Sequence, residues 1–166
     1  MKKSNKKLNK KGFTLIELLA VIVILAVVLS ITIPSVLNSM AKARESSLQN
    51  AADSVAEWFT KQYELAELGS ISGDASAEYK AFIGTAPLPS VSTAALAFDK
   101  SKGKEVLEIA GISNAETNID LANSKVYYNS TKQKACVTLA AKDGGSFYNN
   151  PKDNTDTRNT KSSSGC

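Results

Sequence analysis

The sequence predicts an α+β protein in which one long N-terminal helix packs on a small antiparallel β-sheet. Three observations support this fold class. Residues 13–33 form an apolar run that is long enough for a helix of roughly 30 Å. Residues 34–68 continue a helical pattern, but with apolar side chains on one face only. Later in the chain, short segments rich in strand-forming residues alternate with turn residues.

Residues 1–12 form a basic leader. They contain six lysines and no acidic residue, whereas the 21 residues at 13–33 carry a single charge, Glu17. A basic segment before an apolar stretch of membrane length is retained in the cytoplasm. We therefore expect residues 13–33 to cross the cytoplasmic membrane once, with the remainder of the chain outside.

The small residue Gly12 lies before the apolar run, whereas the cleavage site of an ordinary secretory signal follows its apolar core. A peptidase that cuts between Gly12 and Phe13 removes the leader and leaves the apolar helix on the mature protein. Six of the 20 basic residues are then lost, so that 14 remain against 16 acidic residues, a formal charge of −2. The basic pI of about 9.0 therefore reflects a sorting signal and not a nucleic-acid surface.

Glu17 is the unusual residue of the apolar run. A carboxylate at membrane depth costs about 2.5–3.5 kcal/mol, so it is expected to reach water at the interface or to have a partner. Cleavage after Gly12 creates a positive amine on Phe13, four residues from Glu17. In the packed apolar core of a filament, each of these two charges requires an opposite charge.

The residues Lys-Gly-Phe-Thr-Leu-Ile-Glu at 11–17 resemble the class III signal of type IV pilins and related pseudopilins. The resemblance covers about the first 40 residues. It implies that a prepilin peptidase cleaves after Gly12 and that the new N-terminal residue, Phe13, is methylated. It also implies a salt bridge between the amine of one subunit and Glu17 of its neighbour.

Pro34 lies inside the predicted helix. It removes one backbone hydrogen bond, which predicts a kink or a local melt at residues 30–34. The helical pattern resumes beyond it, with apolar residues at spacings of three or four: Leu48, Ala52, Val55, Phe59, Tyr63 and Ala66. Gly69 suits the C-terminal cap. We expect one assembly helix over residues 13–68, whose second half needs a partner.

Residues 69–166 are expected to form a globular head after a linker at 69–73. Residues 76–83 and 104–110 are predicted to be short helices, whereas residues 94–98 fit either a helix or a strand. Residues 125–129 and 135–140 are predicted strands joined by a polar turn. Residues 146–148 are a candidate third strand and residues 118–121 a candidate fourth. A one-faced sheet packed on a one-faced helix is a stable two-layer arrangement, and the layout is similar to that of type IV pilins.

Two cysteines, Cys136 and Cys166, lie in the part that we expect outside the cell, where disulfides form. One intramolecular pairing is available, and it would stabilise the fold by about 3–4 kcal/mol. The alternative is a free thiol at Cys166. The polar segment at 149–164 resembles a disordered tail on its own, and a disulfide would convert it into a tethered surface loop. In pilins such a cysteine-bounded region lies on the filament surface.

Catalytic and cofactor sites are not expected. The chain has no histidine, which excludes Ser-His-Asp, Cys-His and histidine-based zinc sites, and it has no phosphate-binding glycine motif. Three acidic residues, Asp143, Asp153 and Asp156, do not have the spacing of an EF-hand, so we expect no metal. Tyr127, Tyr128, Lys132 and Lys134 would suit contact with DNA, but a mixed-charge hairpin face explains them equally well.

The sequence thus predicts a structural protein and no enzyme: a type IV pilus subunit that polymerises through its N-terminal helix for adhesion, motility or DNA uptake. Its partners would be further copies of itself, the prepilin peptidase, the assembly machinery, the membrane before assembly, and a surface, cell or DNA. The alternative is a pseudopilin of a type II secretion or competence machine. A monomeric membrane-anchored binding protein would leave Glu17 and the junction of Gly12 and Phe13 without a use.

Overall fold

The computed structural model describes residues 12–68, 75–99, 102–149 and 157–166. The chain divides into two compact units, Met1–Met40 and Ala41–Cys166. The predicted linker at 69–73 lies outside the described residues.

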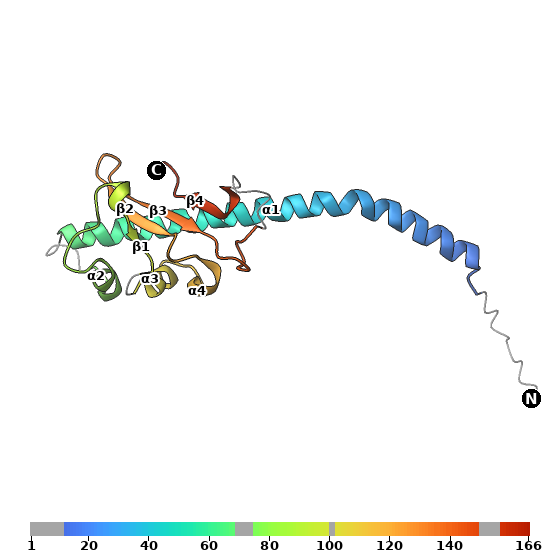
Figure 1. The fold of residues 1–166 in the computed structure, drawn as a ribbon, viewed down its shortest axis with the longest axis horizontal. Helices are drawn as coiled ribbons and strands as arrows, with labels where there is room; N and C mark the ends of the chain where they lie inside the picture. The colour runs from blue at the N-terminus through green and yellow to red at the C-terminus, as the bar shows by residue number, and fades with distance from the viewer. Residues whose placement is uncertain (1–11, 69–74, 100–101, 150–156) are drawn as a thin grey trace, which may run out of the picture. The chain divides into compact units, whose positions relative to one another are not determined.

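The long helix α1 extends over Leu15–Leu68, as predicted, and begins two residues later than expected because Thr14 caps it (Figure 1). Helical structure is continuous through Pro34, so the local melt considered for residues 30–34 is not found. The Ser30 hydroxyl donates a hydrogen bond to the Val27 carbonyl, 2.7 Å away, in the turn that precedes the proline. Because proline has no N–H, the helix lacks one backbone hydrogen bond at Pro34 and remains helical. The kink expected at this proline stays a prediction.

Four antiparallel strands form a single sheet in the order β1-β2-β3-β4 (Figure 1). The strands are β1 (Leu96–Ala97), β2 (Lys125–Asn129), β3 (Lys134–Ala140) and β4 (Thr160–Ser162). The predicted hairpin of β2 and β3 is confirmed, and its register pairs Tyr127 with Cys136. Its turn is closed by the Asn129 side chain, which accepts hydrogen bonds from the two amides at 131 and 132.

The two other strand predictions are wrong. Residues 146–148 form a turn, in which the Asn118 side chain accepts bonds from the amide and hydroxyl of Ser146. Residues 118–121 contribute one isolated bridge, between Ile119 and Ala141. The outer strands are instead β1, which pairs with β2, and β4, which pairs with β3. The strand β4 lies in the segment that the sequence analysis describes as a polar tail.

The core is built from the second half of α1, the inner face of the sheet and apolar residues of the chain between them, from Ala75 to Ile119. The buried residues of α1 recur at helical spacing, and the members of the core on β3 are every second residue, Ala135, Val137 and Leu139, as one-sided packing requires. Fully buried members of this core include Leu48, Val55, Phe59, Val126, Val137 and Leu139. At its edge, the rings of Tyr63 on α1 and Tyr128 on β2 stack with centroids 3.7 Å apart.

Three short helices complete the second unit: α2 (Ala77–Ile83), α3 (Gly103–Ile109) and α4 (Ala115–Asn118). The first two confirm the helices predicted at 76–83 and 104–110 to within one residue at each end. The helix α2 begins where the Ser76 hydroxyl accepts a hydrogen bond from the backbone amide three residues on, a typical N-cap.

An aromatic cluster joins α1 and α2 to the segment after β1. The centroid of the Phe59 ring lies within 6 Å of those of four other rings: Trp58, Tyr79, Phe82 and Phe98. Gly103 allows the start of α3 to approach this cluster, because a Cβ atom there would lie 1.9 Å from the Phe98 carbonyl oxygen.

The second unit should fold without the N-terminal apolar segment. A chain that begins at Ala41 retains the buried stripe of α1, the sheet and the disulfide. We expect it to be a soluble monomer that unfolds cooperatively on heating, measured by circular dichroism and analytical ultracentrifugation. Aggregation, or a transition without cooperativity, would contradict this boundary.

Candidate functional site

The predicted processing junction is exposed and non-helical. Gly12 and Phe13 precede the first helical residue, and the Phe13 side chain is 90% exposed. A Cβ atom added at Gly12 would have no neighbour within 4 Å. The subunit's own fold therefore imposes no requirement for glycine at this position, so a requirement for it would come from the peptidase.

Thr14 and Glu17 form a reciprocal N-terminal cap on α1, a capping box. The Thr14 amide donates to Glu17 Oε2 at 2.8 Å, and the Glu17 amide donates to the Thr14 hydroxyl oxygen at 3.3 Å. The hydroxyl also donates to Oε2, at 2.7 Å. The spacing Thr-x-x-Glu is readable in the sequence, and this local role of Glu17 was missed there.

The capping box contains only atoms of Thr14 and Glu17, so removal of the preceding residues leaves it intact. Its hydrogen bonds to the carboxylate use Oε2, and within the described residues Oε1 has no hydrogen bond. The cap thus fixes the carboxylate at the first turn of the helix and leaves one oxygen for a further partner.

The first unit exposes an apolar surface that no part of its own fold covers. From Phe13 to Met40 the large apolar side chains are between 48% and 90% exposed. Within the described residues, α1 is the one helix that is long and apolar enough to cross a membrane. The apolar segment fits a membrane-anchored precursor, and it requires lipid or other protein around it.

A disulfide joins Cys136 on β3 to Cys166, with Cα atoms 5.7 Å apart, and the two residues are 30 positions apart in sequence. It closes the polar segment predicted to be a tethered loop. Further contacts besides the disulfide hold the end of that segment. The strand β4 pairs with β3, the Ser163 amide donates to the Val137 carbonyl, and the Ser163 hydroxyl accepts a bond from the Val137 amide. Residues 150–156 of this segment lie outside the described residues.

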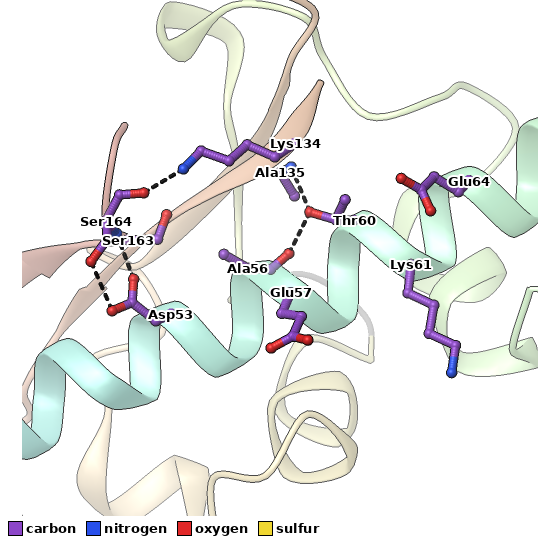
Figure 2. Close-up of a pocket in the computed structure, with 10 residues that line it drawn as sticks. All are labelled: Asp53, Ala56, Glu57, Thr60, Lys61, Glu64, Lys134, Ala135, Ser163 and Ser164. Carbon is purple, nitrogen blue, oxygen red and sulfur yellow. Dashed lines mark hydrogen bonds between the residues drawn. The ribbon is translucent and has the colours of Figure 1, made fainter. Parts of the chain in front are cut away.

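Asp53 on α1 is hydrogen-bonded to Ser164, near the end of the chain (Figure 2). Its carboxylate accepts hydrogen bonds from both the amide and the hydroxyl of Ser164. The ammonium group of Lys134 on β3 donates to the Ser164 carbonyl, so that Ser164 is bonded from a helix and a strand. Burial raises the pKa of Asp53, but the two bonds from Ser164, the bond from Gln49 and the charge of Lys134 together outweigh it and place the pKa below its ordinary value of 3.8.

Two further polar residues of α1 contact the same segment. Lys161 pairs with Glu45, and Gln49 donates to the Ser162 carbonyl at 2.8 Å. With Asp53, these α1 residues recur every four positions and therefore line one face of the helix. We call this line of contacts the polar seam. It joins three residues of α1, Glu45, Gln49 and Asp53, to residues 161–164. No sequence signal pairs these residues in advance.

A hollow of about 560 Å³ opens beside the polar seam (Figure 2). Its lining includes Glu57, Lys61 and Glu64, which are exposed and make no hydrogen bond or ion pair within the described residues. The Thr60 hydroxyl instead accepts a bond from the Ala135 amide at 2.9 Å. The hollow thus combines solvated charges with polar groups that are already hydrogen-bonded.

The four residues considered for DNA contact do not gather on one surface. The ring of Tyr128 stacks on that of Tyr63 at the edge of the core, whereas the side chain of Tyr127, the residue before it on β2, is on the opposite face of the sheet. The ammonium groups of Lys132 and Lys134 bond backbone carbonyls at 164–166. This arrangement explains the two lysines as anchors of the C-terminal segment.

The acidic residues considered for calcium give no cluster in the described structure. Asp143 lies in an exposed turn, whereas Asp153 and Asp156 fall outside the described residues. Among the residues described, no group of three metal-ligating side chains comes together.

The polar seam should make stability depend on pH. The lowered pKa of Asp53 means that its contribution is complete above 3.8, its ordinary value, and is lost as pH falls through the lowered folded-state pKa. Asp53→Asn should lower the free energy of unfolding by about 1 kcal/mol at neutral pH. Thermal melts should show this difference shrinking below pH 4, and a difference that is constant with pH would contradict the assignment.

The disulfide should contribute more than the polar seam. Replacing both cysteines by serine should lower the free energy of unfolding by about 3–4 kcal/mol, because the unfolded chain regains the freedom of the closed segment. Chemical denaturation of both proteins measures the difference. Recovery of two alkylatable thiols from natively isolated, unreduced protein would contradict the bond itself.

Comparison with known families identifies one match. Residues 7–33 match the family model of the prokaryotic N-terminal methylation motif. No curated protein and no solved structure shows significant similarity to the chain. The matched residues include the junction at Gly12, the capping box and the start of the exposed apolar helix. The chain therefore carries the class III signal peptide of type IV pilins, which indicates a precursor of the pilin or pseudopilin kind.

Proposed function

We propose that the chain is the structural subunit of a type IV pilus, stored in the cytoplasmic membrane and polymerised into a surface filament. The observation that carries the proposal is the apolar surface of residues 13–40, most of which lies within the methylation motif matched at residues 7–33. Such a surface is satisfied by lipid before assembly and by neighbouring apolar helices afterwards. The filament would serve adhesion, motility or DNA uptake.

Processing comes first in this proposal. The prepilin peptidase cuts the exposed bond between Gly12 and Phe13, and the new amine of Phe13 is methylated. Because the capping box survives the cut, Glu17 keeps its position at the first helical turn. Its second oxygen then receives the amine of a neighbouring subunit, which gives each buried charge a partner.

The alternative is a pseudopilin of a type II secretion or competence machine, which would use the same signal and helix in a short filament. The polar C-terminal segment favours the pilus, because it is held to the fold by a disulfide and the polar seam and presents an ordered polar surface. Mass analysis of protein sheared from cells tests both proposals. Long filaments built from a chain that begins at methylated Phe13 would support the pilus, and their absence would favour the pseudopilin.

Two substitutions of Glu17 separate its capping role from its charge. Glutamine retains a capping oxygen without the charge, whereas alanine loses both. Both variants should be inserted and cleaved, since neither the leader nor Gly12 changes. Both should give few or no filaments, because an unpaired buried amine costs about 3–5 kcal/mol at each subunit addition.

Immunoblots of membrane and sheared fractions measure precursor, mature chain and filament yield. Normal filaments from Glu17→Gln and few from Glu17→Ala would restrict Glu17 to capping. Normal filaments from both would mean that the carboxylate is merely tolerated near the interface.

A further inference from the structure

The sheet has an outer face that does not belong to the core. On β2 the core residue is Val126, and side chains alternate along a strand, so the residues on either side of it, Lys125 and Tyr127, lie on the outer face. The register pairs Lys125 with Thr138 on β3, which places Thr138 on the same face. Three polar side chains of two neighbouring strands therefore come together there.

A hollow of about 390 Å³ opens over these three side chains. Its remaining lining comes from the 3₁₀ helix η1 (Ser92–Ala94), through Ser92 and Thr93, and from Ala95, the residue that follows η1. We call it the sheet-face hollow. All of its lining residues lie in the second unit, and its volume is within the range of small-molecule sites, about 300–1,000 Å³.

Most polar groups of the sheet-face hollow are unpaired. Within the described residues, the side-chain hydroxyls of Ser92, Thr93 and Tyr127 have no hydrogen bond, and the Lys125 ammonium has neither a hydrogen bond nor an ion pair. The Thr138 hydroxyl alone is engaged, with a hydroxyl of β4 at 2.9 Å. Lys125, Ser92 and Thr93 are exposed and Tyr127 is half-buried, so a ligand can reach all four.

This combination of groups fits a saccharide. The C–H face of a sugar is apolar and can lie against an aromatic ring, while its hydroxyls exchange hydrogen bonds with side-chain hydroxyls. Among the described residues that line the sheet-face hollow, none is acidic and one, Lys125, is basic. The unpaired cation therefore favours a sugar with a negative group. Binding of DNA would need several phosphate contacts, which a single lysine does not supply.

We propose that the sheet-face hollow binds an acidic saccharide. Tyr127 packs against the sugar ring, Lys125 pairs with its anionic group, and the hydroxyls of Ser92 and Thr93 bond the sugar hydroxyls. The inference rests on the proposed function of the filament in adhesion and names the class of ligand for it.

The test uses the full chain in detergent micelles and saturation-transfer NMR. The probe is tetragalacturonate, a linear saccharide with a carboxylate on each sugar, and its methyl ester has the same skeleton without the charge. The unsubstituted chain should bind tetragalacturonate about fivefold more tightly than the ester, because an exposed charge-assisted hydrogen bond contributes about this factor.

Two substitutions separate the charge from the ring. Lys125→Ala should remove the preference for tetragalacturonate and leave binding of the ester unchanged. Tyr127→Ala should weaken both probes by about threefold or more, since ring contact does not depend on the carboxylate. Lys61→Ala is the matched control, because Lys61 is also exposed and unpaired within the described residues but lines the hollow beside the polar seam. It should change neither affinity.

Three results would overturn the saccharide site. These are no saturation transfer to tetragalacturonate, equal affinity of the unsubstituted chain for the two probes, and an unchanged preference in Lys125→Ala. Duplex DNA that binds through Lys125 while tetragalacturonate does not would also overturn it, and would assign the hollow to a nucleic-acid surface.

The binding measurement does not require filaments, so the two proposals can fail separately. Lys125-dependent binding of tetragalacturonate, with no long filaments in the sheared fraction, would support the saccharide site and contradict the pilus. Long filaments built from a chain that does not bind tetragalacturonate would overturn the saccharide site alone.

Discussion

Burial of one stripe of α1 beneath the sheet is the interaction on which the second unit depends. Leu48, Val55 and Phe59 are fully buried there, and each such side chain contributes about 1.5–3 kcal/mol relative to exposure. Residues 15–40 of the same helix have no comparable cover within the chain. The helix α1 therefore has an exposed apolar first part and a second part that is buried on one side. The change occurs near Ala41, whose carbonyl accepts a hydrogen bond from the Asn149 side chain.

The buried stripe also orients the helix face that holds the C-terminal segment. Because the buried side chains of α1 point into the core, the helix face that carries Glu45, Gln49 and Asp53 contacts residues 161–164. Eight helical positions rise by about 12 Å and three strand positions by about 10 Å, so the two lines of residues match in length. Apolar packing therefore sets the position of α1, and the polar seam then places the C-terminal segment.

Much of this fold was predictable from periodicity. The helix ending at Leu68, the hairpin of β2 and β3, and two short helices each carry a local pattern. The strand β4 was not predictable, because Thr160–Ser162 is polar and becomes a strand only through its contacts with β3 and α1. At the N-terminus, the sequence singles out Gly12 and Glu17. It also contains the Thr-x-x-Glu spacing of the capping box, which the sequence analysis did not use. Asp53 and Ser164 are 111 positions apart, and nothing in their local sequence pairs them.

The disulfide has a mechanical consequence. A subunit that carries load in a filament would be pulled through its backbone, and an open chain lengthens by up to about 3.3–3.6 Å for every residue that unravels. The bond between Cys136 and Cys166 removes 30 residue steps from that reserve, which is about 100 Å of extension per subunit. A strained filament would therefore keep its C-terminal segment attached to β3 even after the polar seam had opened.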